Sequence, residues 1–222
     1  MKEPKIVFIL GNSGSGKGTQ AKLLQERLGL DYIGSGDMLR ARKKLNDFTG
    51  RKLRESMDKD TTTRFAPTAI VFKLWVDRWE AMKEKPEFKG FILDASPRKI
   101  REAELLDEML EWFEWKQYVH VIFINVSREE AFHRLTKRRV CQDCKRIIPD
   151  TGELKSHVTC DTCGGRLITR DDDIPEMINN RLDSFEEEVM PVIAYYEKSN
   201  RLTRVNGEQS IEDVYKDIIK AL

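Results

Sequence analysis

Short runs of apolar residues recur along the chain, separated by longer segments in which apolar positions repeat with helical spacing. The runs cover 5–10, Asp31–Gly34, Gly90–Asp94, Val119–Asn125 and Leu202–Asn206. The first run does not alternate with polar residues, which is typical of a strand buried on both faces. Strands that alternate with helical segments favour a parallel sheet with right-handed crossovers. The pattern therefore predicts an α/β fold around a five-stranded parallel sheet.

A glycine-rich loop follows the first predicted strand. We expect a helix over 17–28 directly after the loop, ended by Gly29. Glycines let backbone N–H groups approach an anion, and a helix N-terminus favours negative charge. Strand, loop and helix in this order predict a P-loop that binds nucleotide phosphates, whereas an ordinary glycine-rich turn would not need Lys17. The expected phosphate-binding residues are Gly14, Ser15, Gly16, Lys17, Gly18 and Thr19.

The residue after the loop lysine departs from the commonest P-loop pattern, which has Ser or Thr there as a ligand of Mg²⁺. Gly18 takes that position, and the hydroxyl comes one residue later, at Thr19. We therefore expect the oxygens of the nucleotide and water molecules to hold Mg²⁺. The run Gly-Lys-Gly-Thr resembles that of nucleoside monophosphate kinases.

Two intervals are too long for simple crossovers between strands. Residues 35–89 contain several helical stretches, and a stripe with Trp75 and Trp79 within 70–83 indicates core packing. Residues 140–175 form the second interval. Two insertions at the ligand-binding edge of a sheet suit an enzyme that encloses two substrates and expels water. The predicted domains are a core of 1–34, 90–139 and 176–222, a monophosphate-binding insertion at 35–89 and a lid at 140–175.

Composition narrows the class of protein. The chain has 222 residues, of which 40% are hydrophobic, enough for one globular domain with small insertions. No stretch approaches the roughly 20 apolar residues of a membrane span, and the first strand begins too early for a targeting segment. The net charge of +1 gives no basic field for nucleic acid. We expect a cytoplasmic monomer with neither membrane nor nucleic-acid partners.

All four cysteines lie within 141–163. Cys141 and Cys144 form one Cys-x₂-Cys pair, and Cys160 and Cys163 form another. Two such pairs predict a tetrahedral Zn²⁺ site, which is structural because four protein ligands leave no open position for catalysis. A disulfide pair and unligated thiols are the alternatives. A zinc ribbon that reads nucleic acid is a third, although the loops between the paired cysteines carry few basic residues.

Phosphoryl transfer depends on cations that neutralise phosphate oxygens in a dry site. Arginine suits this role because its guanidinium group binds phosphate with two N–H groups. Each arginine taken singly is typical of a solvated surface residue, so the case rests on the surrounding motifs. The candidates are Arg40, Arg98, Arg134, Arg138, Arg170 and Arg181.

These motifs resemble those of the adenylate kinase family along almost the whole chain. Residues 33–40 are similar to the family's Ile-Ser-Thr-Gly-Asp-Met-Leu-Arg, and residues 94–98 to its Asp-Gly-Phe-Pro-Arg. Residues 134–140 and 170–181 resemble the entry to and exit from the family's lid, and the cysteines match its metal-bearing form. Residues 205–209 resemble the family's final strand and turn.

The resemblance implies roles for individual residues. Asp94 would orient water bound to Mg²⁺, and Arg134 would stack on the adenine of ATP. The implied catalytic residues are Lys17, Arg98, Arg138, Arg170 and Arg181. The implied ATP contacts beyond the P-loop are Arg134, Arg138 and Gln209. The implied contacts of the acceptor nucleotide are Ser35, Arg40, Ala66, Ala95, Arg98, Glu102, Arg170 and Arg181.

Departures from the family pattern concentrate around the implied acceptor site. Residues 58–67 exceed the family's equivalent in length. Adenine presents an N6 donor beside an N1 acceptor, which a glutamine amide matches but an ionised carboxylate does not. For Glu102, a surface position on a helix over 99–110 is the alternative. The chain has Gly34 where the family has Ser, Ser35 where it has Thr, Ala95-Ser96 where it has Gly-Phe, and Glu102 where it has Gln.

The resemblance implies the reaction MgATP + AMP ⇌ 2 ADP, with direct transfer and no covalent enzyme intermediate. The same chemistry on GMP or a pyrimidine monophosphate is one alternative, since the N–H groups of guanine suit a carboxylate at Glu102. A nucleotide-responsive nucleic-acid binder that uses the cysteine segment is the other. The retained arginines argue against that second alternative.

Overall fold

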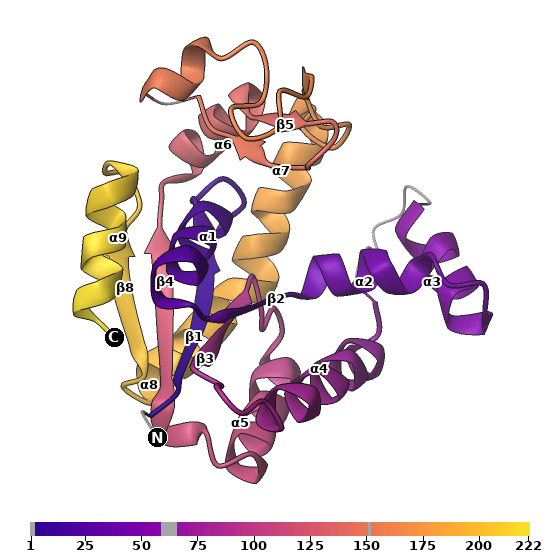
Figure 1. Cartoon of the computed structure of the whole chain (residues 1–222), viewed down its shortest axis with the longest axis vertical. Helices are drawn as coiled ribbons and strands as arrows, with labels where there is room; N and C mark the ends of the chain where they lie inside the picture. Colours follow the sequence, from indigo (N-terminus) through magenta and orange to yellow (C-terminus); the bar gives the residue numbers. More distant parts are fainter. Residues whose placement is uncertain (1–2, 59–65, 151) are drawn as a thin grey trace.

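The computed structural model describes residues 3–58, 66–150 and 152–222. At its centre is a parallel sheet with the strand order β2-β3-β1-β4-β8 (Figure 1). This confirms the five predicted strands, with the first one residue longer than expected. Most of the lengthened segment 58–67 lies outside the described residues. The strands are β1 (Lys5–Gly11), β2 (Asp31–Gly34), β3 (Gly90–Asp94), β4 (Val119–Asn125) and β8 (Leu202–Asn206).

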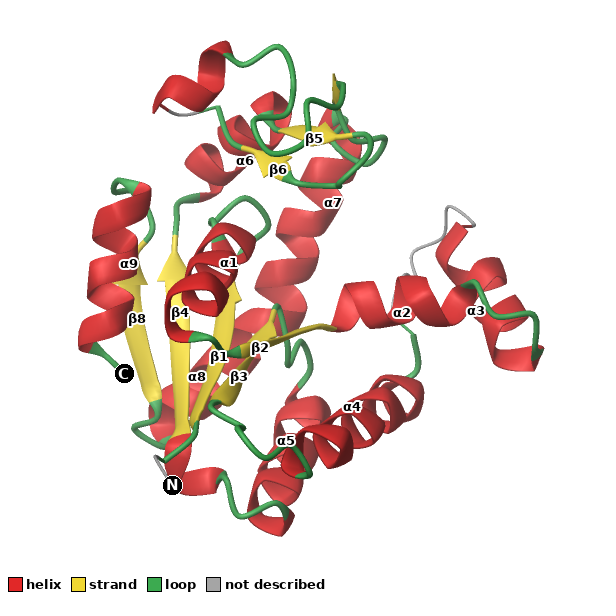
Figure 2. Cartoon of the chain, in the orientation of Figure 1, coloured by secondary structure: helices red, strands yellow, loops and turns green. Residues whose placement is uncertain are grey.

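Helices cover both faces of this sheet, which gives three layers (Figure 2). Alternate side chains of β1 serve the two faces, since successive residues of a strand point in opposite directions. Val7 and Ile9 belong to the core beneath α1 and α9, and Phe8 belongs to the core beneath α4, α5 and α8. The bounds are α1 (Lys17–Leu28), α4 (Thr68–Lys83), α5 (Ile100–Trp112), α8 (Met190–Lys198) and α9 (Ile211–Lys220).

Two sequence predictions about helices are confirmed. Helix α1 begins at Lys17 and ends at Leu28, and Gly29 follows with a φ of 70°, a left-handed conformation that favours glycine. Trp75 and Trp79 of α4 are fully buried. The Trp79 ring lies 4.9 Å from that of Phe91, so the stripe is core packing as expected.

Two parts project from the three-layer core and leave its carboxyl-terminal edge between them (Figure 1). The side arm consists of α2 (Ser35–Lys43) and α3 (Phe48–Asp58). The cysteine-bearing segment stands between α6 (Arg128–Lys137) and α7 (Pro175–Ser184). It forms an antiparallel sheet in the order β6-β5-β7. Its strands are β5 (Arg139–Cys141), β6 (Ile147–Ile148) and β7 (Leu167–Ile168).

Shorter elements complete the chain. Turns of 3₁₀ helix cover Lys116–Tyr118 and Gly152–Ser156, and a π-helical turn over Phe185–Val189 joins α7 to α8. Within the ranges that the structure describes, no helix combines the length and the apolar character needed to cross a membrane.

Candidate active site

A cleft of about 1310 Å³ lies at the carboxyl ends of β1 and β3, where the core, the side arm and the cysteine-bearing segment meet. Fifteen of the predicted site residues line it together. Ser35, Ala66 and Glu102 do not line it. The fifteen are Gly14, Ser15, Gly16, Lys17, Gly18, Thr19, Arg40, Asp94, Ala95, Arg98, Arg134, Arg138, Arg170, Arg181 and Gln209.

The loop from β1 to α1 is shaped for close approach of its backbone to an anion. Gly14 has a φ of 83°, and a Cβ atom there would stand 2.7 Å from the Ala131 carbonyl oxygen. Gly16 has a φ of 93° directly before α1. The Ser15 hydroxyl is buried and has no hydrogen-bond partner in the described part of the chain. A loop with these features and the N-terminus of α1 at its end suits phosphate.

The Lys17 ammonium group lies folded over this loop. Its Nζ donates hydrogen bonds to the carbonyl oxygens of Gly11 at 2.7 Å and Asn12 at 2.6 Å. Burial lowers the pKa of Lys17 to about 8, against the opposing effect of the Asp94 carboxylate. Lys17 therefore stays largely protonated at pH 7 and keeps a cation in the cleft.

Asp94 ends β3 beside Lys17. Burial raises the pKa of its carboxyl group, while Lys17 and a hydrogen bond from Tyr32 act in the opposite direction. The Tyr32 hydroxyl donates to Oδ2 of Asp94 at 2.9 Å. The other oxygen, Oδ1, is buried and has no partner among the described residues.

Two aspartates that were not predicted as site residues gather three of the predicted arginines. Oδ1 and Oδ2 of Asp173 accept two hydrogen bonds from Arg138, at 2.7 and 2.8 Å, and Oδ1 accepts another from Arg181 at 2.7 Å. Asp172 accepts two from Arg170, at 2.8 and 2.9 Å, and a further bond from Arg181. Burial alone would raise the pKa of Asp172, but Arg170 and Arg181 hold it below its usual value. The two carboxylates therefore hold the three guanidinium groups close together.

The side chains of Arg134 and Gln209 lie on one wall of the cleft. Arg134 donates to Glu130 at 2.7 Å and to the Gly207 carbonyl oxygen at 3.0 Å. Gln209 donates to the Asn206 carbonyl oxygen at 2.9 Å. The residues predicted to contact the adenine of ATP are therefore near one another, although they come from α6 and the turn after β8.

On the opposite side of the cleft, Arg40 and Arg98 are the predicted acceptor-side cations. Nη2 of Arg40 lies 2.5 Å from an oxygen of Asp37 in the same helix. Nε of Arg98 donates to the Ala95 carbonyl oxygen at 3.0 Å, and burial lowers the pKa of Arg98. Both guanidinium groups line the cleft.

The predicted acceptor residues outside the cleft lining are all buried. Ser35 Oγ lies 2.7 Å from Ser96 Oγ and accepts a hydrogen bond from the Trp75 indole at 2.9 Å. Ala66 is 6% exposed. Glu102 is 7% exposed, and its Oε2 accepts a hydrogen bond at 2.8 Å from the backbone N–H of Arg98. The alternative of a surface glutamate is therefore wrong, since this carboxylate holds the N-terminal end of α5.

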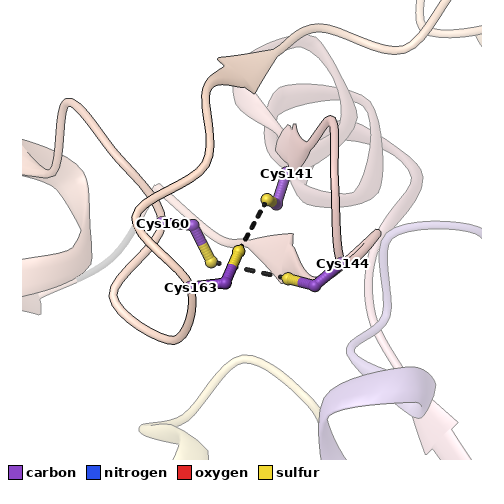
Figure 3. Close-up of side chains that lie close together, drawn as sticks. All are labelled: Cys141, Cys144, Cys160 and Cys163. Atoms are coloured by element: carbon purple, nitrogen blue, oxygen red, sulfur yellow. Dashed lines mark hydrogen bonds between the residues drawn. The ribbon is translucent and has the colours of Figure 1, made fainter.

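The four cysteines converge in space as their spacing predicts (Figure 3). Their sulfur atoms all lie within 4.8 Å of one another. Cys141 and Cys163 are 3.4 Å apart and Cys144 and Cys160 are 3.6 Å apart, so both contacts are far longer than a disulfide bond. Four thiolates at about 2.3 Å from one tetrahedral ion would be separated by about 3.8 Å. The donor set fits Zn²⁺, and the disulfide alternative is wrong.

The chain is similar in sequence to proteins of one known family. A family model described as "Adenylate kinase" matches residues 9–201, which is well over half of the chain. The chain belongs to the adenylate kinase family. As a member, it is a phosphotransferase.

Relatives named adenylate kinase align over almost their entire lengths. The protein of Chlamydia pneumoniae is 36% identical over 226 residues, which cover 100% of this chain and 99% of the relative. That of Methanocella arvoryzae is 38% identical, with 97% of both chains covered. That of Carboxydothermus hydrogenoformans is 39% identical, with 97% of this chain and 98% of the relative covered.

The adenylate kinase cleft also offers a position for the Mg²⁺ that this family uses with ATP. Oδ1 of Asp94 is a buried carboxylate oxygen in the cleft that lacks a partner among residues with described positions. A hard cation or its bound water favours such an oxygen. The residues present therefore fit the metal.

Proposed function

We propose that this adenylate kinase transfers the terminal phosphoryl group of MgATP directly to AMP and so forms two ADP. The observation that carries this proposal is one cleft lined jointly by the P-loop, the side arm and the cysteine-bearing segment. Two nucleotides in one dry cleft can react in line, with catalysis supplied by positioning and by cations. No covalent intermediate on the protein is needed.

The donor would occupy the P-loop side of the cleft. Lys17 would exchange the carbonyl oxygens of Gly11 and Asn12 for oxygens of the β- and γ-phosphates. N–H groups of the loop and of the first turn of α1 would bind the same phosphates. Arg134 and Gln209, which lie on one wall, would contact the adenine.

The transferring group would be neutralised by arginines from several elements. Arg138, Arg170 and Arg181 would move from Asp172 and Asp173 onto phosphate oxygens, since a guanidinium fork binds carboxylate and phosphate in the same way. Arg98 would complete this set from the acceptor side, where Arg40 would bind the phosphate of AMP. This arrangement stabilises the charge of the transition state more than that of either substrate.

Two metals would support the reaction in different ways. Mg²⁺ would neutralise phosphate oxygens of ATP, and Asp94 would orient a water molecule in its shell. Zn²⁺ would order the cysteine-bearing segment by binding Cys141, Cys144, Cys160 and Cys163. The ordered segment would then close over ATP. We propose further that the enzyme acts as a cytoplasmic monomer without nucleic-acid or membrane partners.

The acceptor is tested by measuring ADP formation from MgATP with AMP, GMP, CMP and UMP in parallel. We expect the highest kcat/KM with AMP. A higher kcat/KM with GMP would replace AMP by GMP in the proposal. Absence of ADP formation with all four, together with tight and salt-dependent RNA binding, would favour the nucleic-acid alternative.

Replacing Glu102 by glutamine tests the clearest departure from the family pattern. The glutamine oxygen can still accept the N–H of Arg98, and its NH₂ group would be a donor for N1 of an adenine that reached this buried position. We expect kcat/KM for AMP to stay unchanged or to rise by up to about tenfold, equivalent to about 1.4 kcal/mol. Loss of the negative charge near the N-terminus of α5 should lower the free energy of unfolding by about 0.3–1 kcal/mol.

Glu104→Gln is the matched control, because Glu104 is exposed on the same helix. It should leave both the AMP kinetics and the stability near wild type. A severe loss of AMP turnover in Glu102→Gln alone would contradict the argument that the carboxylate is mismatched to adenine.

A further inference from the structure

A hydrogen bond joins Tyr32 of β2, which precedes the motif at 33–40, to the aspartate at the end of β3. The Tyr32 hydroxyl donates to Oδ2 of Asp94 at 2.9 Å. The two strands are parallel, and Asp94 is the register partner of Gly34. Because Tyr32 and Gly34 are two residues apart, they lie on the same face of β2. The phenol ring therefore runs along the strand, past Gly34, to reach Asp94.

The ring can take this path only because residue 34 has no side chain. A Cβ atom on Gly34 would stand 2.7 Å from the Tyr32 hydroxyl oxygen and 2.9 Å from Cε1 of the ring. The backbone of Gly34 has a φ of −102° and a ψ of 108°, which any residue adopts. A side chain at position 34 would therefore leave the backbone conformation unstrained but would remove space for Tyr32 and for Oδ2 of Asp37, which would stand 2.8 Å from the added Cβ. Gly34 is one of the positions at which the sequence departs from the family pattern.

The two carboxylate oxygens of Asp94 differ in their hydrogen bonding. Oδ2 is held by Tyr32, while Oδ1 is buried without a partner in the described ranges. A hydrogen bond to one oxygen restricts rotation of the carboxylate and so fixes where the other oxygen lies. Both Tyr32 and Asp94 line the cleft.

We propose that Tyr32 is a positioning residue that fixes the Asp94 carboxylate so that its free oxygen receives a water molecule of nucleotide-bound Mg²⁺, and that Gly34 provides the room for it. The inference rests on the proposed role of Asp94. Tyr32 and Gly34 would thus join Asp94 in the part of the cleft that binds the metal and its water molecules. Tyr32 would touch neither the phosphates nor the metal, and would act only through Asp94.

The test uses the full-length enzyme with Mn²⁺ as a paramagnetic substitute for Mg²⁺. Its dissociation constant from the enzyme–ATP complex is measured by electron paramagnetic resonance, which does not depend on turnover. Tyr32→Phe removes only the hydroxyl and should weaken Mn²⁺ binding about three- to tenfold, the range expected for one lost hydrogen bond. The affinity for metal-free ATP, measured by calorimetry, should change less than about twofold.

Two further variants distinguish loss of Asp94 positioning from a general loss of structure. Gly34→Ala should displace the ring and weaken Mn²⁺ binding as Tyr32→Phe does, and the double variant should be no weaker than either single one. Tyr195→Phe is the matched control, because the Tyr195 hydroxyl donates to Asp107 at 2.7 Å outside the cleft. It should leave Mn²⁺ binding at the wild-type value.

The outcomes distinguish this inference from the proposal on which it rests. If Asp94→Asn weakens Mn²⁺ binding but Tyr32→Phe does not, the inference about Tyr32 is wrong and the role of Asp94 stands. If Asp94→Asn leaves Mn²⁺ binding unchanged, the role of Asp94 in the proposed function is wrong. If Tyr32→Phe weakens the binding of Mn²⁺ and the binding of metal-free ATP by the same factor, the positioning role of Tyr32 is also wrong.

Discussion

Replacing Lys17 by alanine is expected to reduce kcat by roughly 10²–10³, equivalent to about 3–4 kcal/mol of transition-state stabilisation. The ammonium group lies half-buried over the P-loop, where it is held by two backbone carbonyl oxygens and its charge is less screened than at the open surface. Because it would follow the phosphoryl group through the transfer, its loss should affect kcat more than the binding of ATP. Steady-state rates of ADP formation at saturating ATP and AMP measure the effect.

Lys22→Ala is the control for this substitution. Lys22 lies on the same helix, where its exposed side chain faces Glu26 at 3.7 Å. We expect its kcat to equal that of the wild type. A Lys17→Ala enzyme that keeps more than about a third of the wild-type kcat would show that the loop has been assigned the wrong role.

Removing the metal from the four cysteines is expected to lower Tm by on the order of 10 °C, since binding of a structural metal is coupled to folding. The described residues of the segment between α6 and α7 form strands of two or three residues and a short 3₁₀ turn, so the segment has little core of its own. Chelation at elevated temperature, followed by calorimetry, measures the shift. Metal analysis of the purified enzyme should find one Zn²⁺ per chain, and added Zn²⁺ should restore Tm.

Cys144→Ser should reproduce the effect of chelation, whereas Gln142→Ala should not. Gln142 is exposed in the same turn and has no ligand atom in the cysteine cluster. Hydrogen exchange should locate the disorder in residues 141–163. If the purified enzyme contains no divalent metal at close to one ion per chain, the metal site is wrong and the four cysteines are unligated thiols.

The strands and the first helix could be predicted because local sequence determines them. A parallel strand buried on both faces needs a continuous apolar run, so β1 and β4 were located to within one residue. Strands β5, β6 and β7 were not predicted, since two or three residues carry no periodic signal. The cysteine spacing nevertheless located the cluster, because two Cys-x₂-Cys pairs constrain geometry on their own.

Contacts between distant segments were the part that could not be predicted. Arg138 and Asp173 are 35 residues apart, and only the folded chain brings their side chains together. Glu102 was correctly placed on a helix, but its burial depends on the path of the chain through Arg98 before α5. The contact of Tyr32 with Asp94 depends on the register of β2 against β3 and on the missing side chain at Gly34.

The central claim is that one cleft holds ATP and AMP side by side. Calorimetry with a ligand made of two adenosines joined through a polyphosphate chain tests it most directly. The account predicts one ligand per chain, bound more tightly than either nucleotide alone because the two halves share one binding event. It also predicts that this ligand competes with both ATP and AMP. Two ligands bound per chain, or competition with only one of the nucleotides, would contradict the account.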